Sequence, residues 1–220
     1  MTEVIAVDGP SGVGKTSVSR GVARRLAMGH LDTGAFYRAA AMAALVSRVD
    51  LHTEAHVLSV VSGATFDYDE GVMTLEGIDI SSAIRSEHIT QSASRIAVYP
   101  SVRNVLVRCQ REWVAQRGGR AVVEGRDIGT VVFPDALLKV YLSARPEVRA
   151  GRRAGETLSS GSASAIQEHL TERDNVDSTR TASPLMAAED AVTLDTSDLS
   201  EAEVIARVLE LATQRGFGAG

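Results

Sequence analysis

The chain has 220 residues, a formal net charge of −5 and a single cysteine, and its length suits one domain with a full hydrophobic core. The acidic balance argues against a broad nucleic-acid-binding surface, and one cysteine excludes an internal disulfide framework or a multi-cysteine metal site. With no run of about eighteen apolar residues and no signal-peptide pattern, we expect a cytoplasmic protein that binds neither nucleic acid nor membrane.

The most informative motif lies near the N-terminus. Residues 9–16 read Gly-Pro-Ser-Gly-Val-Gly-Lys-Thr, which matches the phosphate-loop pattern G-x-x-x-x-G-K-S/T. An apolar run at 4–7 precedes the loop, and Val18, Val22 and Leu26 recur after it on one helix face. In such a unit, backbone N–H groups surround phosphate oxygens, and the lysine reaches the β- and γ-phosphates. We therefore predict a triphosphate-binding loop rather than a Gly-rich turn with an incidental lysine.

The rest of the chain alternates between apolar runs and helical patterns. The further runs that suit buried strands are 29–31, 121–123, 138–142 and 191–194. This alternation predicts an α/β fold, a P-loop NTPase-like parallel sheet of about five strands with helices on both faces. Phosphates then bind at the carboxyl ends of the strands. A capping box of Ser200 and Glu203 predicts the start of the last helix, which a Gly-rich tail that frays would follow.

Two segments interrupt the alternation. Residues 64–80 alternate at period two around two turn signals that each contain a Glu-Gly pair, and they predict a small antiparallel insert. Residues 154–165 are rich in small and polar residues, and Arg149, Arg152 and Arg153 precede them. Those arginines favour a mobile lid that closes on phosphates, with an ordinary solvated loop as the alternative.

Charged side chains gather at two strand ends. In Leu-Asp-Thr-Gly-Ala-Phe-Tyr-Arg, which begins at residue 31, Thr33 lies at a strand-to-helix turn, with Tyr37 and Arg38 in the first helical turns. Either Asp32 or Thr33 is a candidate N-cap. The sequence Glu-Gly-Arg-Asp at 124–127 ends a core strand with a charged cluster, which indicates a metal or ligand site.

A third cluster follows the expected lid. Arg173, Asp177 and Arg180 are spaced to share one helix face. A solvated salt-bridge stripe is the alternative. Phosphoryl transfer requires several arginines from different segments, because two anionic substrates must be held in line and the transferring charge neutralised.

Taken in order, these motifs resemble the bacterial cytidylate kinases, nucleoside monophosphate kinases that make CDP from CMP. The resemblance spans nearly the whole chain and includes the insert. It rests on DGPSGVGK from Asp8, LDTGAFYR from Leu31, ASRIAVYPSVR from Ala93, EGRDIGTVVFPDA from Glu124 and an R-D…D…R spacing from Arg173. It implies phosphoryl transfer from MgATP to CMP and dCMP in pyrimidine nucleotide metabolism, by a monomer that requires ATP and Mg²⁺.

The resemblance also implies a role for particular residues. Those at the ATP phosphates would be Gly9, Ser11, Gly12, Val13, Gly14, Lys15, Thr16, Ser17, Arg149, Arg152 and Arg153. Those at the CMP phosphate would be Thr33, Tyr37, Arg38 and Arg126, and those that read the cytosine edge would be Ser94, Arg103 and Asp127. Arg173 and Asp177 would contact the sugar hydroxyls, and Arg180 would bridge the two phosphate groups. The residues implied in catalysis are Lys15, Arg126, Asp127 and Arg180.

The implied organisation is a single kinase domain over residues 1–220. Its parts would be a core at 1–32, 84–148 and 182–220, a monophosphate-binding region at about 33–83 with the insert 64–80, and a lid at about 149–180.

The chain departs from many relatives at three places. Glu124 stands where many have Asp, and Thr33 stands where many have Ser. After Lys15 many relatives have Gly-Thr, whereas this chain has Thr16 and Ser17. By the general loop rule we expect Thr16 to meet Mg²⁺, with Ser17 as the alternative. The five histidines show no spacing typical of a metal site.

Three other functions are weighed against this one. A nucleotide-driven switch would need D-x-x-G and N-K-x-D motifs, which the sequence lacks. Another small-molecule or nucleotide kinase, of the UMP, gluconate or shikimate type, would share the loop but have no evident use for the insert. A non-catalytic ATP-binding module would not need so many arginines around a closing lid.

Overall fold

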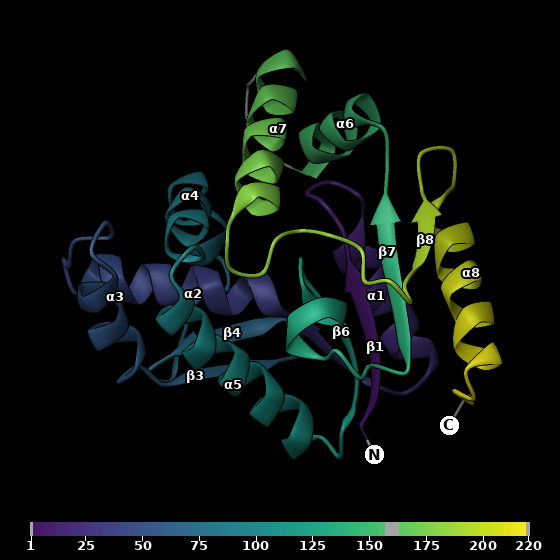
Figure 1. Ribbon diagram of the computed structural model, residues 1–220, viewed down its shortest axis with the longest axis horizontal. Coiled ribbons are helices and arrows are strands. Elements are labelled where there is room, and N and C mark those ends of the chain that lie inside the picture. Colours follow the sequence, from purple (N-terminus) through teal and green to yellow (C-terminus); the bar gives the residue numbers. More distant parts are fainter. Residues whose placement is uncertain (1, 157–162, 219–220) are drawn as a thin grey trace. The chain divides into compact units, whose positions relative to one another are not determined.

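The computed structural model describes residues 2–156 and 163–218 (Figure 1). The chain divides into two compact units. The first unit comprises Met1–His30 and Gly119–Gly220, and the second unit comprises Leu31–Gly118. In the part of the chain that is described, no helix is long and apolar enough to cross a membrane.

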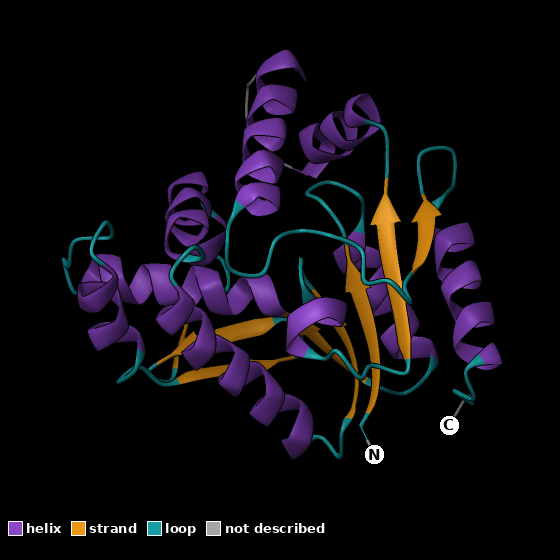
Figure 2. Ribbon diagram, in the orientation of Figure 1, coloured by secondary structure: helices purple, strands orange, loops and turns teal. Residues whose placement is uncertain are grey.

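A five-stranded sheet forms the framework of the fold, with the strand order β2-β6-β1-β7-β8. Figure 2 shows the strands in orange and the helices in purple. Its strands are β1 (Glu3–Asp8), β2 (Gly29–Asp32), β6 (Arg120–Glu124), β7 (Leu138–Ser143) and β8 (Val192–Asp195). The β1 strand pairs in parallel with β6 and β7, and β7 pairs in parallel with β8. The apolar side chains of the central strands are themselves buried, as in a parallel sheet that is covered on both faces. All five predicted strands are confirmed, with ends that differ by at most one residue.

The helical elements of the first unit follow the strands. They are α1 (Lys15–Arg25), a π-helical turn (Ile128–Val132), α6 (Pro146–Glu156), α7 (Ala163–Thr179) and α8 (Glu201–Gln214). Apolar side chains of α1 and α8 share one core cluster with those of β1, β6 and β7. The predicted capping box is confirmed, since Ser200 and Glu203 each bond the other's backbone at the start of α8.

Two expectations about irregular segments were wrong in part. The tail after α8 packs rather than frays as far as Phe217, whose side chain is buried and whose N–H donates to the Ala212 carbonyl. The segment 154–165, which the sequence predicts as a lid or a solvated loop, is helical at both ends, because α6 runs to Glu156 and α7 begins at Ala163. Residues 157–162 lie outside the described part of the chain.

The second unit combines helices with a small antiparallel sheet. Its elements are α2 (Thr33–Val46), α3 (Glu54–Val61), β3 (Phe66–Asp69), β4 (Val72–Leu75), β5 (Ile78–Asp79), a 3₁₀ turn (Ala83–Arg85), α4 (Glu87–Ile96) and α5 (Pro100–Gln116). The predicted antiparallel insert is confirmed as β3-β4-β5. Both of its Glu-Gly turns have positive φ at both residues, the backbone geometry that joins tight hairpins.

Aromatic side chains form the centre of the second unit. Tyr68 and Phe36 are each almost fully buried, and their ring centroids lie 6.3 Å apart. Trp113 packs edge-on against Tyr68, and its indole N–H donates to the Tyr68 carbonyl. The insert therefore packs into the core of this unit through β3, where Tyr68 lies.

Candidate active site

The phosphate loop joins the carboxyl end of β1 to the start of α1. Its turn requires glycine at two positions. Gly9 has φ +145°, and a Cβ there would lie 2.2 Å from the Leu142 carbonyl oxygen of β7. Gly14, with φ +90°, precedes the first residue of α1. The loop thus ends at a helix N-terminus, where free N–H groups and the helix dipole favour an anion.

Lys15 is buried and turns back over the loop. Its Nζ donates to the Gly9 carbonyl at 2.8 Å and to the Pro10 carbonyl at 2.7 Å. Burial, and after it the positive charge of Arg126, lower the pKa of Lys15 to about 7, while the charge of Glu124 opposes the change. A phosphate at this position would supply the negative charge that keeps the ammonium protonated.

A hydroxyl, a carboxylate and an imidazole form a chain of hydrogen bonds at the start of α1. Thr16 Oγ1 donates to Glu124 Oε2 at 2.9 Å. His30 Nε2 lies 2.9 Å from Glu124 Oε1. Ser17 Oγ instead donates to the Gly14 carbonyl at 3.0 Å. The two hydroxyls that the sequence left as alternatives therefore differ, because only Thr16 is held by a buried carboxylate.

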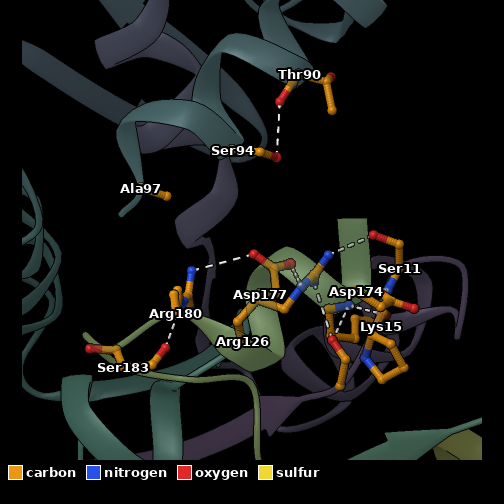
Figure 3. Close-up of polar contacts among 12 residues, drawn as sticks. Ser11, Lys15, Thr90, Ser94, Ala97, Arg126, Asp174, Asp177, Arg180 and Ser183 are labelled. Carbon is orange, nitrogen blue, oxygen red and sulfur yellow. Dashed lines mark hydrogen bonds and ion pairs between the residues drawn. The ribbon is translucent and has the colours of Figure 1, made fainter. Parts of the chain in front are cut away.

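Arg126 connects the loop to α7, as Figure 3 shows. Its Nε donates to Asp177 Oδ2 at 2.8 Å, its Nη2 donates to Ser11 Oγ at 2.6 Å, and its Nη1 donates to the Gly9 carbonyl at 3.2 Å. Burial raises the pKa of Asp177, but the charges of Arg126 and then Arg180 outweigh it and hold that pKa below its ordinary value. The alternative of a solvated salt-bridge stripe on α7 is therefore wrong for Asp177, which is buried and paired.

The C-terminal half of α7 brings a second carboxylate to the loop. Asp174 Oδ1 accepts a hydrogen bond from the backbone N–H of Ser11 at 3.2 Å. Its other oxygen pairs with Arg149 of α6, which also donates to the Ser11 carbonyl at 3.2 Å. The Asp174 carboxylate thus accepts a hydrogen bond from a loop N–H group of the kind that binds phosphate oxygen. Arg173, on the same helix, acts electrostatically on Lys15.

The remaining arginines of the expected lid differ in their surroundings. Arg152 donates to Thr196 Oγ1 at 2.8 Å and to the Thr196 carbonyl at 2.6 Å, and it reaches the Val13 carbonyl at 3.3 Å. It therefore ties the loop after β8 to the phosphate loop. Arg153 lies one residue further along α6. Arg180 follows α7, and its Nη1 lies 3.4 Å from Asp177 Oδ1.

The second unit holds the other residues that the resemblance implies for CMP. Thr33 begins α2 after Asp32, whose side chain does not cap the helix but pairs with Arg38 at 2.7 Å. The Arg103 guanidinium lies 5.4 Å from the centre of the Tyr37 ring. Its Nη1 donates to the Ala97 carbonyl at 3.2 Å.

Ser94 belongs to α4 of the same unit. Its hydroxyl donates to the Thr90 carbonyl at 3.3 Å, one turn earlier (Figure 3). The hydroxyl still has lone pairs to accept with, so it can serve as an acceptor for a ligand.

Sequence reasoning gave no role to Asp8. Its two oxygens each accept a backbone N–H at 2.8 Å, from Ile128 and from Gly129. Burial raises the pKa of Asp8 to about 6, although those two hydrogen bonds oppose the rise. Asp8 therefore fixes the segment after Asp127, itself buried, to the start of the phosphate loop. The position of Asp8 directly before the phosphate loop is the sequence signal that could have identified its role.

The hydrogen bond between Thr16 and Glu124 leaves the Thr16 oxygen suited to bind Mg²⁺. The proton of Thr16 is donated to Glu124, so the hydroxyl keeps its lone pairs for a cation. Mg²⁺ prefers oxygen ligands and is usually held by one or two protein groups together with water and substrate phosphates. Over residues 2–156 and 163–218, no group of three or more His, Cys, Asp or Glu side chains could hold a metal by itself. The fit is therefore to a metal that arrives with a phosphate ligand.

Comparison of the sequence with known proteins identifies the family. The sequence profile described as cytidylate kinase matches residues 5–214. The cytidylate kinase of Mycobacterium leprae (strain Br4923) is 47% identical over 215 residues, which cover 96% of each chain. That of Rhodococcus jostii (strain RHA1) is 44% identical over 225 residues and covers 99% of this chain and 97% of the relative.

Solved structures share the fold at low identity. The crystal structure of TT1252 from Thermus thermophilus superposes with a TM-score of 0.54 at 16% identity and covers 99% of each chain. An uncharacterized protein from Eubacterium ventriosum ATCC 27560 gives the same TM-score at 8% identity, covering 97% of this chain and 99% of that one. At such identities the likeness concerns the fold alone.

Proposed function

This chain belongs to the cytidylate kinase family, and on that premise we propose that it transfers the γ-phosphoryl group of ATP to CMP and dCMP. The bond from the γ-phosphorus to the β–γ bridging oxygen breaks, and its electron pair leaves with ADP. A phosphate oxygen of the acceptor forms the new bond, which gives CDP or dCDP. This chemistry asks the protein for position and positive charge more than for proton transfer.

The hydrogen bonds of Arg126 give this proposal its strongest structural support. Arg126, which the resemblance assigns to the acceptor phosphate, donates hydrogen bonds to Ser11 and Gly9 of the loop assigned to ATP. A guanidinium group has five donors in a planar fork, so it can contact phosphate oxygens of two molecules at once. This arrangement suits a two-substrate site better than an ATP-binding module or a nucleotide switch.

The donor half of the proposed site lies in the first unit. The loop N–H groups and the N-terminus of α1 would bind the ATP phosphates. Lys15 would exchange its bonds to the Gly9 and Pro10 carbonyls for phosphate oxygens, with its ammonium form stabilised by them. Mg²⁺, when bound with ATP, would neutralise part of the charge on the β- and γ-phosphates, and the Thr16 hydroxyl would help to hold it.

The roles toward the acceptor remain proposals that rest on the resemblance. In the first unit, Arg126 and Arg180 would neutralise phosphate charge, Arg173 and Asp177 would contact the sugar, and Asp127 the base. In the second unit, Thr33, Tyr37 and Arg38 would serve the CMP phosphate, and Ser94 and Arg103 the cytosine. A base edge needs both donors and acceptors, and a hydroxyl, a guanidinium and a carboxylate together supply both.

We also propose that the enzyme acts as a cytoplasmic monomer. The chain has one cysteine, the half-buried Cys109, which is free, and a chain without disulfides suits a reducing compartment. Light scattering should give a mass near 23.3 kDa; a mass near twice that value would contradict the monomer.

Product analysis tests the function directly. Purified protein with ATP, Mg²⁺ and CMP should form CDP and ADP in equal amounts by anion-exchange chromatography. The chain has only two lysines, Lys15 and Lys139, so matched substitutions are available. Lys15→Met should slow CDP formation by about a hundredfold or more, because it removes charge at the transferring group. Lys139→Met, which breaks a pair with Asp190, should retain most activity. ATP hydrolysis without CDP would overturn the proposal.

A further inference from the structure

His30 contacts Glu124, the residue that holds the Thr16 hydroxyl of the phosphate loop, through a hydrogen bond. It lies on β2, and Glu124 ends the neighbouring strand β6. The distance from His30 Nε2 to Glu124 Oε1 is 2.9 Å, and the two side chains are 10% and 4% exposed. The contact is therefore a buried, directed one rather than a surface pairing.

Glu124 uses its second oxygen for a different partner. Oε2 accepts the proton of Thr16 at 2.9 Å. A hydroxyl has one proton, so donating it to Glu124 fixes the rotation of the Thr16 side chain and directs its lone pairs elsewhere. That orientation is the one an oxygen needs in order to bind a cation.

A glutamate reaches Thr16 through a flexible side chain. With three side-chain torsions, a carboxylate held at only one oxygen can rotate away from its partner. The ring of His30, which lies on a strand of the sheet, contacts Oε1, so both oxygens of the carboxylate are held. Groups that orient the direct ligands of a metal in this way commonly tune its affinity.

We propose that His30 is a positioning residue for the metal of MgATP. It holds Glu124, Glu124 holds the Thr16 proton, and Thr16 thereby presents its lone pairs to Mg²⁺. His30 itself touches neither nucleotide nor metal. The inference rests on the proposed use of MgATP, and it is independent of which molecule accepts the phosphoryl group.

Two substitutions separate positioning from packing. His30→Phe keeps a flat ring of similar size and removes the ring nitrogens, whereas the amide nitrogen of His30→Gln can reach the position of Nε2. The dissociation constant of a non-hydrolysable ATP analogue is measured by calorimetry with Mg²⁺ and with EDTA. No acceptor is present, so failure of the proposed acceptor chemistry would leave this result unaffected.

The proposal predicts a change confined to the metal. His30→Phe should lose about tenfold of the gain in affinity that Mg²⁺ gives, with the EDTA value within about twofold of wild type. His30→Gln should keep most of that gain. In a Thr16→Val background, His30→Phe should have no further effect, because the hydroxyl it orients is gone.

Three results would overturn it. They are a full Mg²⁺ gain in His30→Phe, an equal loss of affinity with Mg²⁺ and with EDTA, or additive effects of the His30 and Thr16 substitutions. If His30→Phe does not fold, as judged by its thermal melting, His30→Asn replaces it in the same measurements, since its shorter amide cannot reach Glu124 from the same backbone position.

Discussion

The neighbouring hydroxyls of Thr16 and Ser17 have different hydrogen-bond partners, and this difference bears on which of them can bind a metal. Thr16 donates to the buried Glu124 carboxylate, whereas Ser17 donates to the Gly14 carbonyl of its own turn. Ser17, inside α1, therefore makes only a local bond to the carbonyl of the residue that precedes the helix. A threonine bonded to a carboxylate at the end of the adjacent strand is oriented by the tertiary structure. The local arrangement therefore favours Thr16 as the hydroxyl that meets Mg²⁺.

Substituting each hydroxyl tests this assignment. Thr16→Val keeps the shape and removes the oxygen, so kcat/KM with MgATP should fall by roughly a hundredfold because a metal ligand is lost. Ser17→Ala should stay within about threefold of wild type, since it removes only a local bond. Initial rates over a range of Mg²⁺ concentrations give both values. The reverse ranking of the two variants would assign the metal to Ser17.

Asp8 makes a prediction about pH. Burial raises the pKa of its carboxyl to about 6, so the folded chain holds this proton over a range where the unfolded chain has released it. The stability that Asp8 contributes is then fully present below about pH 3.8 and is lost as the pH rises through 6.

Asp8→Asn isolates that contribution because asparagine does not titrate. The free energy of unfolding of wild type, taken relative to the variant, should fall by about 2 kcal/mol between pH 4.5 and pH 7. Urea denaturation of both proteins at the two pH values measures it. A difference that is constant with pH would show that the Asp8 pKa is not raised.

Helix α7 delivers acidic as well as basic side chains to the loop. Asp174 accepts the Ser11 N–H and pairs with Arg149, while Asp177 pairs with Arg126. These carboxylates accept hydrogen bonds from N–H and guanidinium groups of the kind that bind phosphate. In the proposed mode of binding, ATP displaces Asp174 from the Ser11 N–H, and the free energy of that contact then opposes binding.

Removing the Asp174 carboxylate should strengthen ATP binding. We expect Asp174→Ala to lower the dissociation constant of ATP by roughly three- to tenfold, because the Ser11 N–H and Arg149 no longer have a competing anion. Asp190→Ala, which removes a carboxylate paired with Lys139 instead, is the matched control and should leave the constant unchanged. Equal or weaker ATP binding in Asp174→Ala would contradict the competition.

The elements were more predictable from sequence than the contacts of the site. Periodicity found all five sheet strands and the antiparallel insert, because apolar runs and Glu-Gly turns are local signals. The roles of His30 and Asp174 were missed, since they depend on which strands are neighbours and on where α7 meets the loop. Small polar residues in the lid suggested a loop, but helix formation extends through 154–156 and 163–165.

Considered over its full length, the chain has one family and two compact units. The family profile matches residues 5–214, across both units. The first unit holds the phosphate loop, Lys15 and the arginines of α6 and α7. The second holds Tyr37 and Arg103 in contact with one another. The site residues of either unit, taken alone, do not explain which acceptor is chosen. The identity of the acceptor is therefore the property for which the family assignment makes the most specific prediction.

A panel of acceptors is therefore the decisive measurement. Values of kcat/KM with MgATP are determined for CMP, dCMP, UMP, AMP and GMP under identical conditions. We predict that CMP and dCMP are the best acceptors and that UMP is poorer, because a site that hydrogen-bonds the cytosine amine leaves polar groups unpaired when uracil binds. Equal values for CMP, AMP and GMP, or no transfer to CMP, would contradict the assignment.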